Sequence, residues 1–429
     1  MIKRSFFTLT KPEFRYDLLE EPLKEPESIP VPDNLILLLN EPMDSTKQAL
    51  IKKGDSVIKG EKLCLYEDST EYTITPVAGL IDSIDIYFDD LGNTATYLVI
   101  KKDQNDKADA ATFDLKEDID SVDKYFRTLP GAPSLEGLAN KKNKINTIII
   151  TCTDSDLLET TSQYVASQFS NEIKQGVQIL KKLTNVPRLC VTVPENSKIK
   201  KEFETMQVFE TSLKYPSNLK AIVLKNHFNI ILPAGQASED AGVCFISAEA
   251  VASLGKAYKT KSANFEKHLT IIDKQGKRHR VTATIGTSLG KIFKKLSIHI
   301  NDGERILIGG PMHGTATYTL HHPVQPGMNT IIIQDKSVIS QISDSACINC
   351  GKCVQICPAN IPVNILVRYL EADQYEDAAD KYDLESCIEC GLCAYVCTAK
   401  IPLFQHIKLG KHELSTLKAS SVELETANE

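Results

Sequence analysis

The stretch CINCGKCVQICPANIP, residues 347–362, contains four cysteines with two, two and three residues between them, followed by a proline. A second stretch, CIECGLCAYVCTAKIP at residues 387–402, repeats this spacing. Eight of the twelve cysteines of the chain lie in these two runs. Thiolates are metal ligands, and four sulfurs in a short run suit either zinc or an iron–sulfur cluster. The distribution therefore predicts metal binding and not disulfides.

The spacing distinguishes between these metals. Zinc ribbons tend to use two isolated cysteine pairs, whereas each run here has three closely spaced cysteines and a fourth further on, which favours two [4Fe–4S] clusters over zinc or purely structural cysteines. The runs resemble those of two-cluster ferredoxins, in which the fourth cysteine ligates the other cluster. This resemblance implies two ligand groups, namely Cys347, Cys350, Cys353 with Cys397, and Cys387, Cys390, Cys393 with Cys357.

Residues around the cysteines fit the same interpretation. Gly351 and Gly391 follow the second cysteine of each run, where a backbone without side chains could approach inorganic sulfide. Pro358 follows the fourth cysteine of the first run, but Thr398 stands at that place in the second. The segment between the runs predicts two short helices. Two neighbouring clusters would provide a path for single electrons.

Composition sets limits on the class of protein. The chain has 429 residues, a formal net charge of −7 and 42% hydrophobic residues, values typical of a soluble protein with two to four domains. No stretch approaches the roughly 20 apolar residues needed to cross a bilayer, and the first residues do not form a secretory signal. We expect a cytoplasmic protein without a nucleic-acid partner. The four scattered cysteines are expected to be buried apolar side chains, namely Cys64, Cys152, Cys190 and Cys244.

The N-terminal third predicts an arm, a β domain and a linker. After an arm at residues 1–30, short alternating apolar runs separated by glycine turns predict a barrel or sandwich at 31–102. The phrases IKKGDSVIKGEKL and TPVAGLIDSI within it resemble the lipoyl or biotinyl hammerhead fold, but the segment CLYEDSTEYTI between them lacks the lysine that a carrier would need. The polar, acidic stretch 103–124 predicts a linker.

The middle of the chain predicts an α/β domain at residues 125–262. The segments INTIIIT, RLCVTVP and LKAIVLK (219–225) are predicted as strands, and helices are expected over about 156–183 and in SAEAVASLGKAY. Alternating strands and helices predict a largely parallel sheet. Residues 263–335 resemble a ubiquitin-like β-grasp module of the soluble-ligand-binding (SLBB) type. The helical two-cluster domain is expected at 336–412 and a flexible tail at 413–429.

The whole pattern resembles one family, the RnfC-like proteins, including PrdC-like relatives. The resemblance is carried by the hammerhead phrases, EIKQGVQILKKL, LIGGPMHGTA, HPVQPGMNTIII and the tandem cysteine runs, in that order over roughly residues 30–410. It implies a multidomain α/β chain with a hammerhead, a Rossmann-like flavin and nicotinamide module, a β-grasp domain and a ferredoxin-like two-cluster domain. It also implies electron flow between NADH, FMN, clusters and a partner.

The flavin module departs from the family pattern. The glycine-rich loop of the family is replaced by LPGAPSLEGLANKKNK (129–144), with only Gly131 and Gly137. The stretch that lines the flavin in the family is replaced by TCTDSDLLETT, in which Cys152 and Asp154 do not restore the expected contacts, and a later glycine-rich element is not recognisable. We therefore expect that FMN and NADH are not bound in the usual way.

The resulting functional hypothesis is an electron-transfer subunit. It would relay single electrons through two [4Fe–4S] clusters. The donor would be ferredoxin, flavodoxin or a dehydrogenase, and the acceptor a reductase complex, or the reverse. We expect the protein in an anaerobe, either free in the cytoplasm or attached to a membrane complex at its cytoplasmic face. The alternatives are an FMN-dependent NADH:ferredoxin oxidoreductase subunit and a scaffold in which clusters only hold the C-terminal domain together. The lysine-rich segments 140–144 and 406–418 could steer an acidic partner or be solvated surface.

Overall fold

The computed structural model describes residues 11–20, 22–103, 118–132, 135–139 and 144–427. Two compact units share the chain. We name the one that contains both cysteine runs the cluster unit; it consists of the described parts of Met1–Tyr16, Lys214–Ala237 and Ser340–Glu429. The other, the main unit, consists of Asp17–Leu213 and Ser238–Ile339. Each unit is therefore assembled from segments that are far apart in the sequence.

A four-stranded parallel sheet forms the α/β part of the main unit. Its order is β10 (Gln207–Thr211), β9 (Arg188–Pro194), β8 (Thr147–Thr151) and β11 (Val243–Ser247), and every neighbouring pair is parallel. The predicted parallel sheet is confirmed. Its central strands are rich in β-branched residues because both of their faces are buried.

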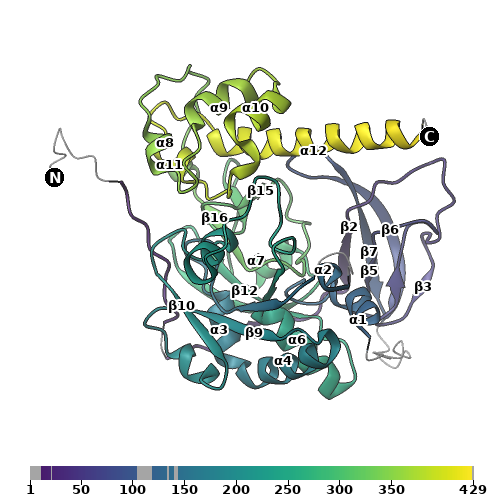
Figure 1. The fold of residues 1–429 in the computed structure, drawn as a ribbon. Coiled ribbons are helices and arrows are strands. Elements are labelled where there is room, and N and C mark those ends of the chain that lie inside the picture. Colours follow the sequence, from purple (N-terminus) through teal and green to yellow (C-terminus); the bar gives the residue numbers. More distant parts are fainter. Residues whose placement is uncertain (1–10, 21, 104–117, 133–134, 140–143, 428–429) are drawn as a thin grey trace. The chain divides into compact units, whose positions relative to one another are not determined.

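Helices α4 (Ser170–Thr184) and α6 (Ala248–Thr260) lie side by side next to this sheet (Figure 1). A Cβ atom at Gly176 would lie 2.1 Å from the carbonyl oxygen of Val251, and one at Gly255 would lie 2.1 Å from that of Glu172. The two glycines therefore allow the helix backbones to touch. The single helix expected over 156–183 is instead two, α3 (Thr161–Gln168) and α4, which are separated at Phe169.

A six-stranded mixed sheet follows in the main unit. Its order is β1 (Glu27–Ser28), β13 (Arg278–Thr284), β12 (Glu266–Ile272), β16 (Thr330–Gln334), β14 (Arg305–Ile308) and β15 (Thr315–Thr317). Helix α7 (Leu289–Lys295) packs its apolar side chains into the core of this sheet. Strand β1 comes from the expected N-terminal arm, so part of that arm is a sheet strand. A short 3₁₀ turn, η3 (Lys336–Val338), follows β16.

The predicted all-β segment is also present. One sheet has the order β2 (Asn34–Leu39), β7 (Thr94–Lys102), β6 (Gly79–Phe88) and β3 (Ser56–Val57), and β4 (Lys62–Leu63) pairs with β5 (Thr73–Ile74). Alternate residues of β2 and β7 fill its core. Most of the expected linker, residues 104–117, lies outside the described residues. Helix α1 (Ile119–Phe126) begins within its last residues, and α2 (Glu136–Ala139) and η1 (Lys198–Phe203) complete the main unit.

The cluster unit is helical. It contains α8 (Lys352–Ile356), α9 (Val363–Leu370), α10 (Tyr375–Tyr382), η4 (Leu384–Ser386), α11 (Leu392–Val396) and the long helix α12 (Leu403–Ala427). The predicted pair of helices between the cysteine runs is confirmed by α9 and α10. The tail expected at 413–429 is helical as far as Ala427, because α12 continues through it. Within the described residues, no helix is both long enough and apolar enough to cross a membrane.

One predicted strand is wrong. The segment LKAIVLK (219–225) forms α5 (Lys220–Val223) and the start of a π-helical turn, Leu224–Phe228, within the cluster unit. A short apolar run does not by itself distinguish a strand from a buried helix, so packing decides between them. Here Val223 and Leu224 are both buried in the helical conformation.

Candidate metal centre

The two cysteine runs adopt the same local conformation. In each run, a left-handed residue lies between the first two cysteines (Asn349, φ 55°; Glu389, φ 56°) and a left-handed glycine precedes a five-residue helix (Gly351, φ 70°; Gly391, φ 68°). A Cβ atom at Gly351 would meet no protein atom within 4 Å. The positive φ, which glycine adopts without strain, therefore explains this glycine better than close packing within the protein.

The first ligand group surrounds a small cavity. The cysteines that line it are three from the first run and one from the second, namely Cys347, Cys350, Cys353 and Cys397. Ile401 and Leu403 form part of its apolar wall. Cys350 is exposed, and the backbone N–H of Lys352 holds the pKa of its thiol below the usual range. The cavity therefore brings together sulfurs that are up to 50 residues apart in the sequence.

The second group is more deeply buried. Burial raises the pKa of the Cys390 thiol to about 12, and repulsion from Cys387 and Cys357 contributes to the rise. Burial also raises the pKa of Cys393, where Cys387, Cys390 and Cys357 add repulsion. Cys357 of the first run packs against the same apolar core as Cys387 and Cys393, near enough to the second run to affect the ionisation of its thiols. Metal binding would replace the thiol protons and release them to solvent.

Side chains from outside the runs contact the second group. The hydroxyl of Tyr215 donates a hydrogen bond of 2.7 Å to the carbonyl oxygen of Cys390. The ammonium group of Lys411, on α12, donates to the carbonyl oxygen of Cys387 at 2.6 Å and to Oε1 of Glu389 at 2.7 Å. Nothing local in the sequence marked Tyr215, and Lys411 was noted only as part of the lysine-rich segment 406–418, because the residues that the two side chains contact are at least 22 positions away.

The described N-terminal residues hold Tyr215 in place. Arg15 and Lys214 form an antiparallel bridge, and the backbone N–H of Tyr215 donates to the carbonyl of Phe14 at 2.9 Å. The Phe14 ring packs edge-on against Tyr395 of α11, with ring centroids 4.6 Å apart. Part of the expected N-terminal arm is therefore packed on the second cysteine run.

The donor set suits clusters. Within the described part of the chain, no three His, Cys, Asp or Glu side chains are placed to bind a single metal ion. A cubane cluster binds its four thiolates at four different iron atoms, so its ligands need not converge on one point. The surrounding core is apolar and includes Leu366, Ile361 and Ile407. The eight cysteines and this core fit two [4Fe–4S] clusters.

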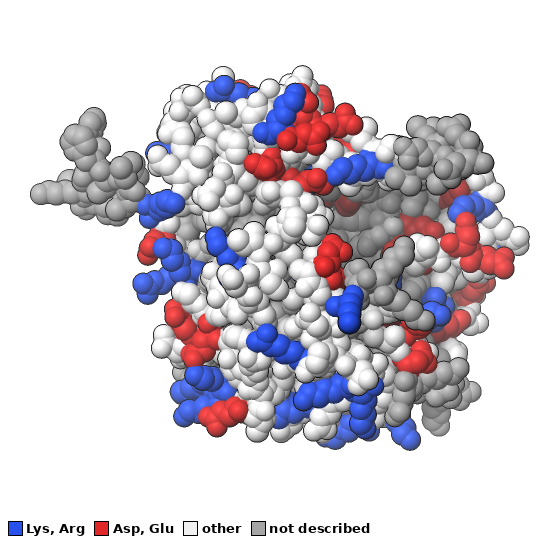
Figure 2. Space-filling model, viewed as in Figure 1, with Lys and Arg blue, Asp and Glu red and all other residues white. Residues whose placement is uncertain are grey.

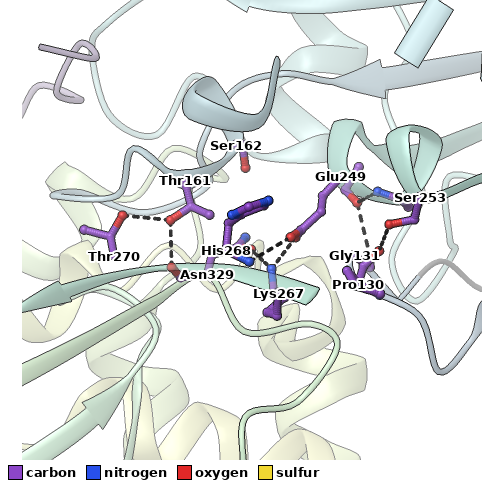
Figure 3. Close-up of polar contacts among 12 residues, drawn as sticks. Pro130, Gly131, Thr161, Ser162, Glu249, Ser253, Lys267, His268, Thr270 and Asn329 are labelled. Atoms are coloured by element: carbon purple, nitrogen blue, oxygen red, sulfur yellow. Dashed lines mark hydrogen bonds and ion pairs between the residues drawn. The ribbon is translucent and has the colours of Figure 1, made fainter. Parts of the chain in front are cut away.

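The main unit contains the segments that depart from the flavin pattern. Residues 133–134 and 140–143 lie outside the described residues. The described part of the replacement loop is closed against protein: the N–H of Gly131 donates to Pro326, and its carbonyl accepts from the Ser247 hydroxyl at 3.3 Å. The carbonyl of Pro130 accepts from Ser253 in α6 at 3.2 Å (Figure 3). The loop backbone is therefore bound to α6.

The segment after β8 is acidic and buried. Asp154 accepts hydrogen bonds from Ser162 N and Gln163 Nε2, and Asp156 accepts from the backbone N–H groups of Met312 and His313. Burial raises the pKa of Glu159 to about 8, and repulsion from Asp154 and Asp156 adds to the rise. Asp156 and Glu159 line a cavity of about 310 Å³ beside Gly309 and Gly310. Among the described residues, no lysine or arginine lines this cavity, so it offers a phosphate group no cationic side chain from that part of the chain.

A buried ion pair joins the α/β layer to the six-stranded sheet. Lys267 of β12 donates to the carboxylate of Glu249 in α6 and, at 3.0 Å, to Oδ1 of Asn329 (Figure 3). The side chains of Lys267 and Glu249 are 0% and 8% exposed. No sequence motif indicated this contact.

The prediction about the four scattered cysteines has a clear outcome, and His322 has a defined environment. Cys152, Cys190 and Cys244 are buried, as expected, whereas Cys64 is only partly buried. His322 is buried and receives or donates a hydrogen bond at Nδ1 with Tyr97, and burial lowers its pKa to about 4. The expected lysine-rich segment 140–144 lies outside the described residues except for Lys144.

Comparisons with known proteins agree with the cysteine pattern. A family described as "4Fe-4S dicluster domain" matches residues 338–401. A component of an ion-translocating oxidoreductase complex from Vibrio cholerae is 26% identical over an alignment of 386 positions, which covers 83% of this chain and 49% of that protein. A component of a proton-translocating ferredoxin:NAD(+) oxidoreductase complex from Clostridium ljungdahlii is 24% identical over an alignment of 381 positions, which covers 83% of each chain.

The chain spans about half the length of the first of these relatives. The similarity to RnfC-like proteins expected from the sequence is confirmed, and the dicluster match confirms two [4Fe–4S] clusters as the cofactors. Among solved structures, an NAD⁺-reducing [NiFe]-hydrogenase in the H₂-reduced state matches with a TM-score of 0.42 and 10% identity, over 71% of this chain and 62% of that one.

Proposed function

We propose that the chain is an RnfC-like electron-transfer subunit that relays single electrons through two [4Fe–4S] clusters. The observation that carries the proposal is the cavity lined by Cys347, Cys350 and Cys353 of one run and Cys397 of the other. Because cysteines from both runs line this cavity, the two runs form one structural unit that would hold two clusters close together. This arrangement supports electron transfer between neighbouring centres.

We assign the ligands in two groups. The first is Cys347, Cys350, Cys353 and Cys397, and the second is Cys387, Cys390, Cys393 and Cys357. The shared cavity supports the first group. The second is supported by the raised thiol pKa values of Cys390 and Cys393, which arise mainly from burial and to which repulsion from Cys387 and Cys357 contributes. The clusters, when bound, supply one-electron chemistry. The chain holds the thiolates on turns of the same conformation and packs most of them against apolar side chains that limit water access, whereas Cys350 is exposed.

The proposal does not include the usual FMN and NADH site. Two features support this part: the loop at Pro130–Gly131 is hydrogen-bonded to α6, and the cavity after β8 is lined by Asp156 and Glu159 without a lysine or arginine from the described residues. Burial raises the pKa of both carboxyl groups, and Glu159 holds a proton near neutral pH, so neither side chain supplies the positive charge that would pair with a flavin phosphate. FMN-dependent NADH oxidation is therefore the alternative that the experiment below has to exclude.

The partners are proposed to be redox proteins. The names of the relatives indicate a complex of several proteins, and one name includes ferredoxin, so we propose another member of such a complex or a ferredoxin-type or flavodoxin-type carrier as donor and acceptor. We also propose peripheral attachment to such a complex at the cytoplasmic face of a membrane. On the face shown in Figure 2, basic and acidic side chains are interspersed. That pattern suits protein partners better than nucleic acid.

One experiment separates the relay from the alternatives. The full chain is reconstituted anaerobically with iron and sulfide, and iron, sulfide and acid-extractable FMN are quantified before and after addition of NADH. We expect eight irons per chain on the basis of two four-iron clusters, low-temperature EPR signals of two reduced clusters with dithionite, and no bleaching with NADH. Stoichiometric FMN with bleaching by NADH would contradict the relay without flavin. If the clusters cannot be reduced reversibly, the remaining hypothesis is a scaffold in which the clusters only hold the C-terminal domain together.

A further inference from the structure

Hydrogen-bond donors outside the second cysteine run reach both ends of its first turn. Lys411 donates to the carbonyl oxygen of Cys387 at 2.6 Å, and Tyr215 donates to that of Cys390 at 2.7 Å. Both cysteines belong to the proposed second ligand group. The donors come from α12 and from the segment that begins at Lys214, so neither is part of the cysteine run.

The equivalent positions of the first run are different. Among the described residues, no side chain donates a hydrogen bond to the carbonyl oxygen of Cys347 or Cys350. Glu389 of the second run corresponds to Asn349 of the first, whose side chain is neutral and accepts a hydrogen bond from Asn364 at 2.6 Å. Cys350 is exposed, whereas Cys390 is 7% exposed. The conformation is repeated, but the charge and the burial around it are not.

This difference has an electrostatic consequence. Reduction of a [4Fe–4S] cluster adds one electron and makes its charge more negative, so a nearby cation stabilises the reduced form and a nearby anion opposes it. The Lys411 side chain is 24% exposed, and its charge is therefore screened less than that of a fully solvated lysine. Glu389 is paired with Lys411 at 2.7 Å and partly compensates its charge.

We propose that Lys411 is a positioning residue that raises the reduction potential of the second cluster, that Glu389 lowers the same potential, and that Tyr215 fixes the turn on which Cys390 is held. The inference rests on the proposed function, because it requires that both clusters bind and accept electrons. The first cluster lacks these contacts, so its potential does not depend on them.

The test is a redox titration of the reconstituted full chain with dithionite as the electron donor, followed by low-temperature EPR. Lys411→Met should lower the potential of one cluster and Glu389→Gln should raise it, each by about a tenfold change in the equilibrium constant, which is about 59 mV for a one-electron couple. The reduction potential of the double variant should lie between those of the two single variants. Lys411→Arg should restore the original potential, since it retains the charge.

Two further variants complete the design. Tyr215→Phe should broaden the EPR signal of the same cluster and speed its loss to a chelator, because the Cys390 turn loses a donor. Lys352→Met removes an exposed lysine beside Cys350 and should change the reduction potential of the first cluster instead of the second. Glu389→Gln keeps the bond from Lys411 to Cys387, so it remains informative even when Lys411→Met does not assemble.

The outcomes are distinct. If the unmodified chain has no pair of reducible clusters, the proposed function fails and this inference fails with it. If loaded Lys411→Met and Glu389→Gln both keep the original potentials, only the inference is overturned. The same holds if the two substitutions shift both clusters equally, because the contacts described here reach one cluster alone.

Discussion

Lys267 and Glu249 form an ion pair that is almost fully removed from water, between β12 and α6. The backbone N–H of His268 also donates to Glu249, at 3.3 Å, and Asn329 accepts from Lys267. A second pair, Lys256 with Glu266, joins the same helix to the same strand at 3.2 Å but is 40% and 60% exposed. The two pairs therefore provide a matched comparison of burial.

Lys267→Met should reduce the free energy of unfolding of the main unit by about 3–5 kcal/mol, because Glu249 would remain buried without its cation. Urea denaturation followed by far-UV circular dichroism measures the effect, since the chain has no tryptophan. The control Lys256→Met should cost about 1 kcal/mol or less. The double variant Lys267→Met/Glu249→Gln should regain part of the loss. Equal losses at the two lysines would show that burial of the first pair is unimportant.

Gly176 should not tolerate a side chain. Gly176→Ala places a Cβ atom 2.1 Å from the carbonyl oxygen of Val251, so α4 and α6 must move apart, and we expect a loss of about 1–3 kcal/mol. Gly290→Ala in α7 is the control, because its Cβ would make only ordinary contacts of 3.4 Å with Leu320. That change should be neutral or stabilise by up to about 1 kcal/mol. Thermal melting of both variants checks the prediction, which fails if the two variants have the same melting temperature.

The buried Glu159 predicts a pH dependence. Its pKa in the folded chain is about 8, above the usual 4.5, so between these values the folded state holds a proton that the unfolded state has lost. Stability should therefore fall as the pH rises through this window, by at most about 1.4 kcal/mol per pH unit for this group. Glu159→Gln should flatten the fall, as measured by urea midpoints at pH 5, 6, 7 and 8.

Glu304 provides the control for this measurement. The backbone N–H of Asn301 and the Lys274 ammonium hold its pKa below the usual value, so its contribution is lost only when the pH falls through the acidic range. Glu304→Gln should therefore leave the slope between pH 5 and 8 unchanged. A slope that is as steep in Glu159→Gln as in the unmodified chain would refute the assignment.

Single substitutions can test whether the fourth cysteine of each run ligates the cluster of the other run. Cys397→Ser and Cys357→Ser should each reduce iron and sulfide content. In each variant, the EPR signal of one cluster should be weakened more than that of the other. The cluster that survives in Cys397→Ser should be the one that responds to Lys411, and the cluster that survives in Cys357→Ser should not respond. Cys190→Ser, at a buried cysteine of β9, should retain both clusters. The reverse pattern of survival would mean that each run binds its own cluster.

Local sequence was sufficient for features that depend on spacing or periodicity. The two cysteine runs predicted the clusters that the dicluster match supports, and β-branched runs such as TIIIT predicted the parallel strands. Turn glycines and alternating apolar residues predicted the elements of the β segment. These features are encoded by neighbours in the chain, so they can be read without knowledge of the fold.

Long-range packing decided the rest. Nothing in LKAIVLK indicated that it forms a helix in the cluster unit, because that unit is assembled from segments that are far from residues 219–225 in the sequence. The contact of Asp156 with the loop at Met312 likewise joins residues 156 positions apart.

The sequence by itself determined which sulfurs are available for two clusters, since ligand spacing is a local property. The tertiary structure alone decided that Tyr215 and Lys411 reach the second cysteine run while the first run has no equivalent donors among the described residues. The physical reason is that two local motifs with the same cysteine spacing and backbone conformation acquire different surroundings when they fold. Burial, charge and hydrogen bonding around a cluster come from segments that only the folded chain brings together.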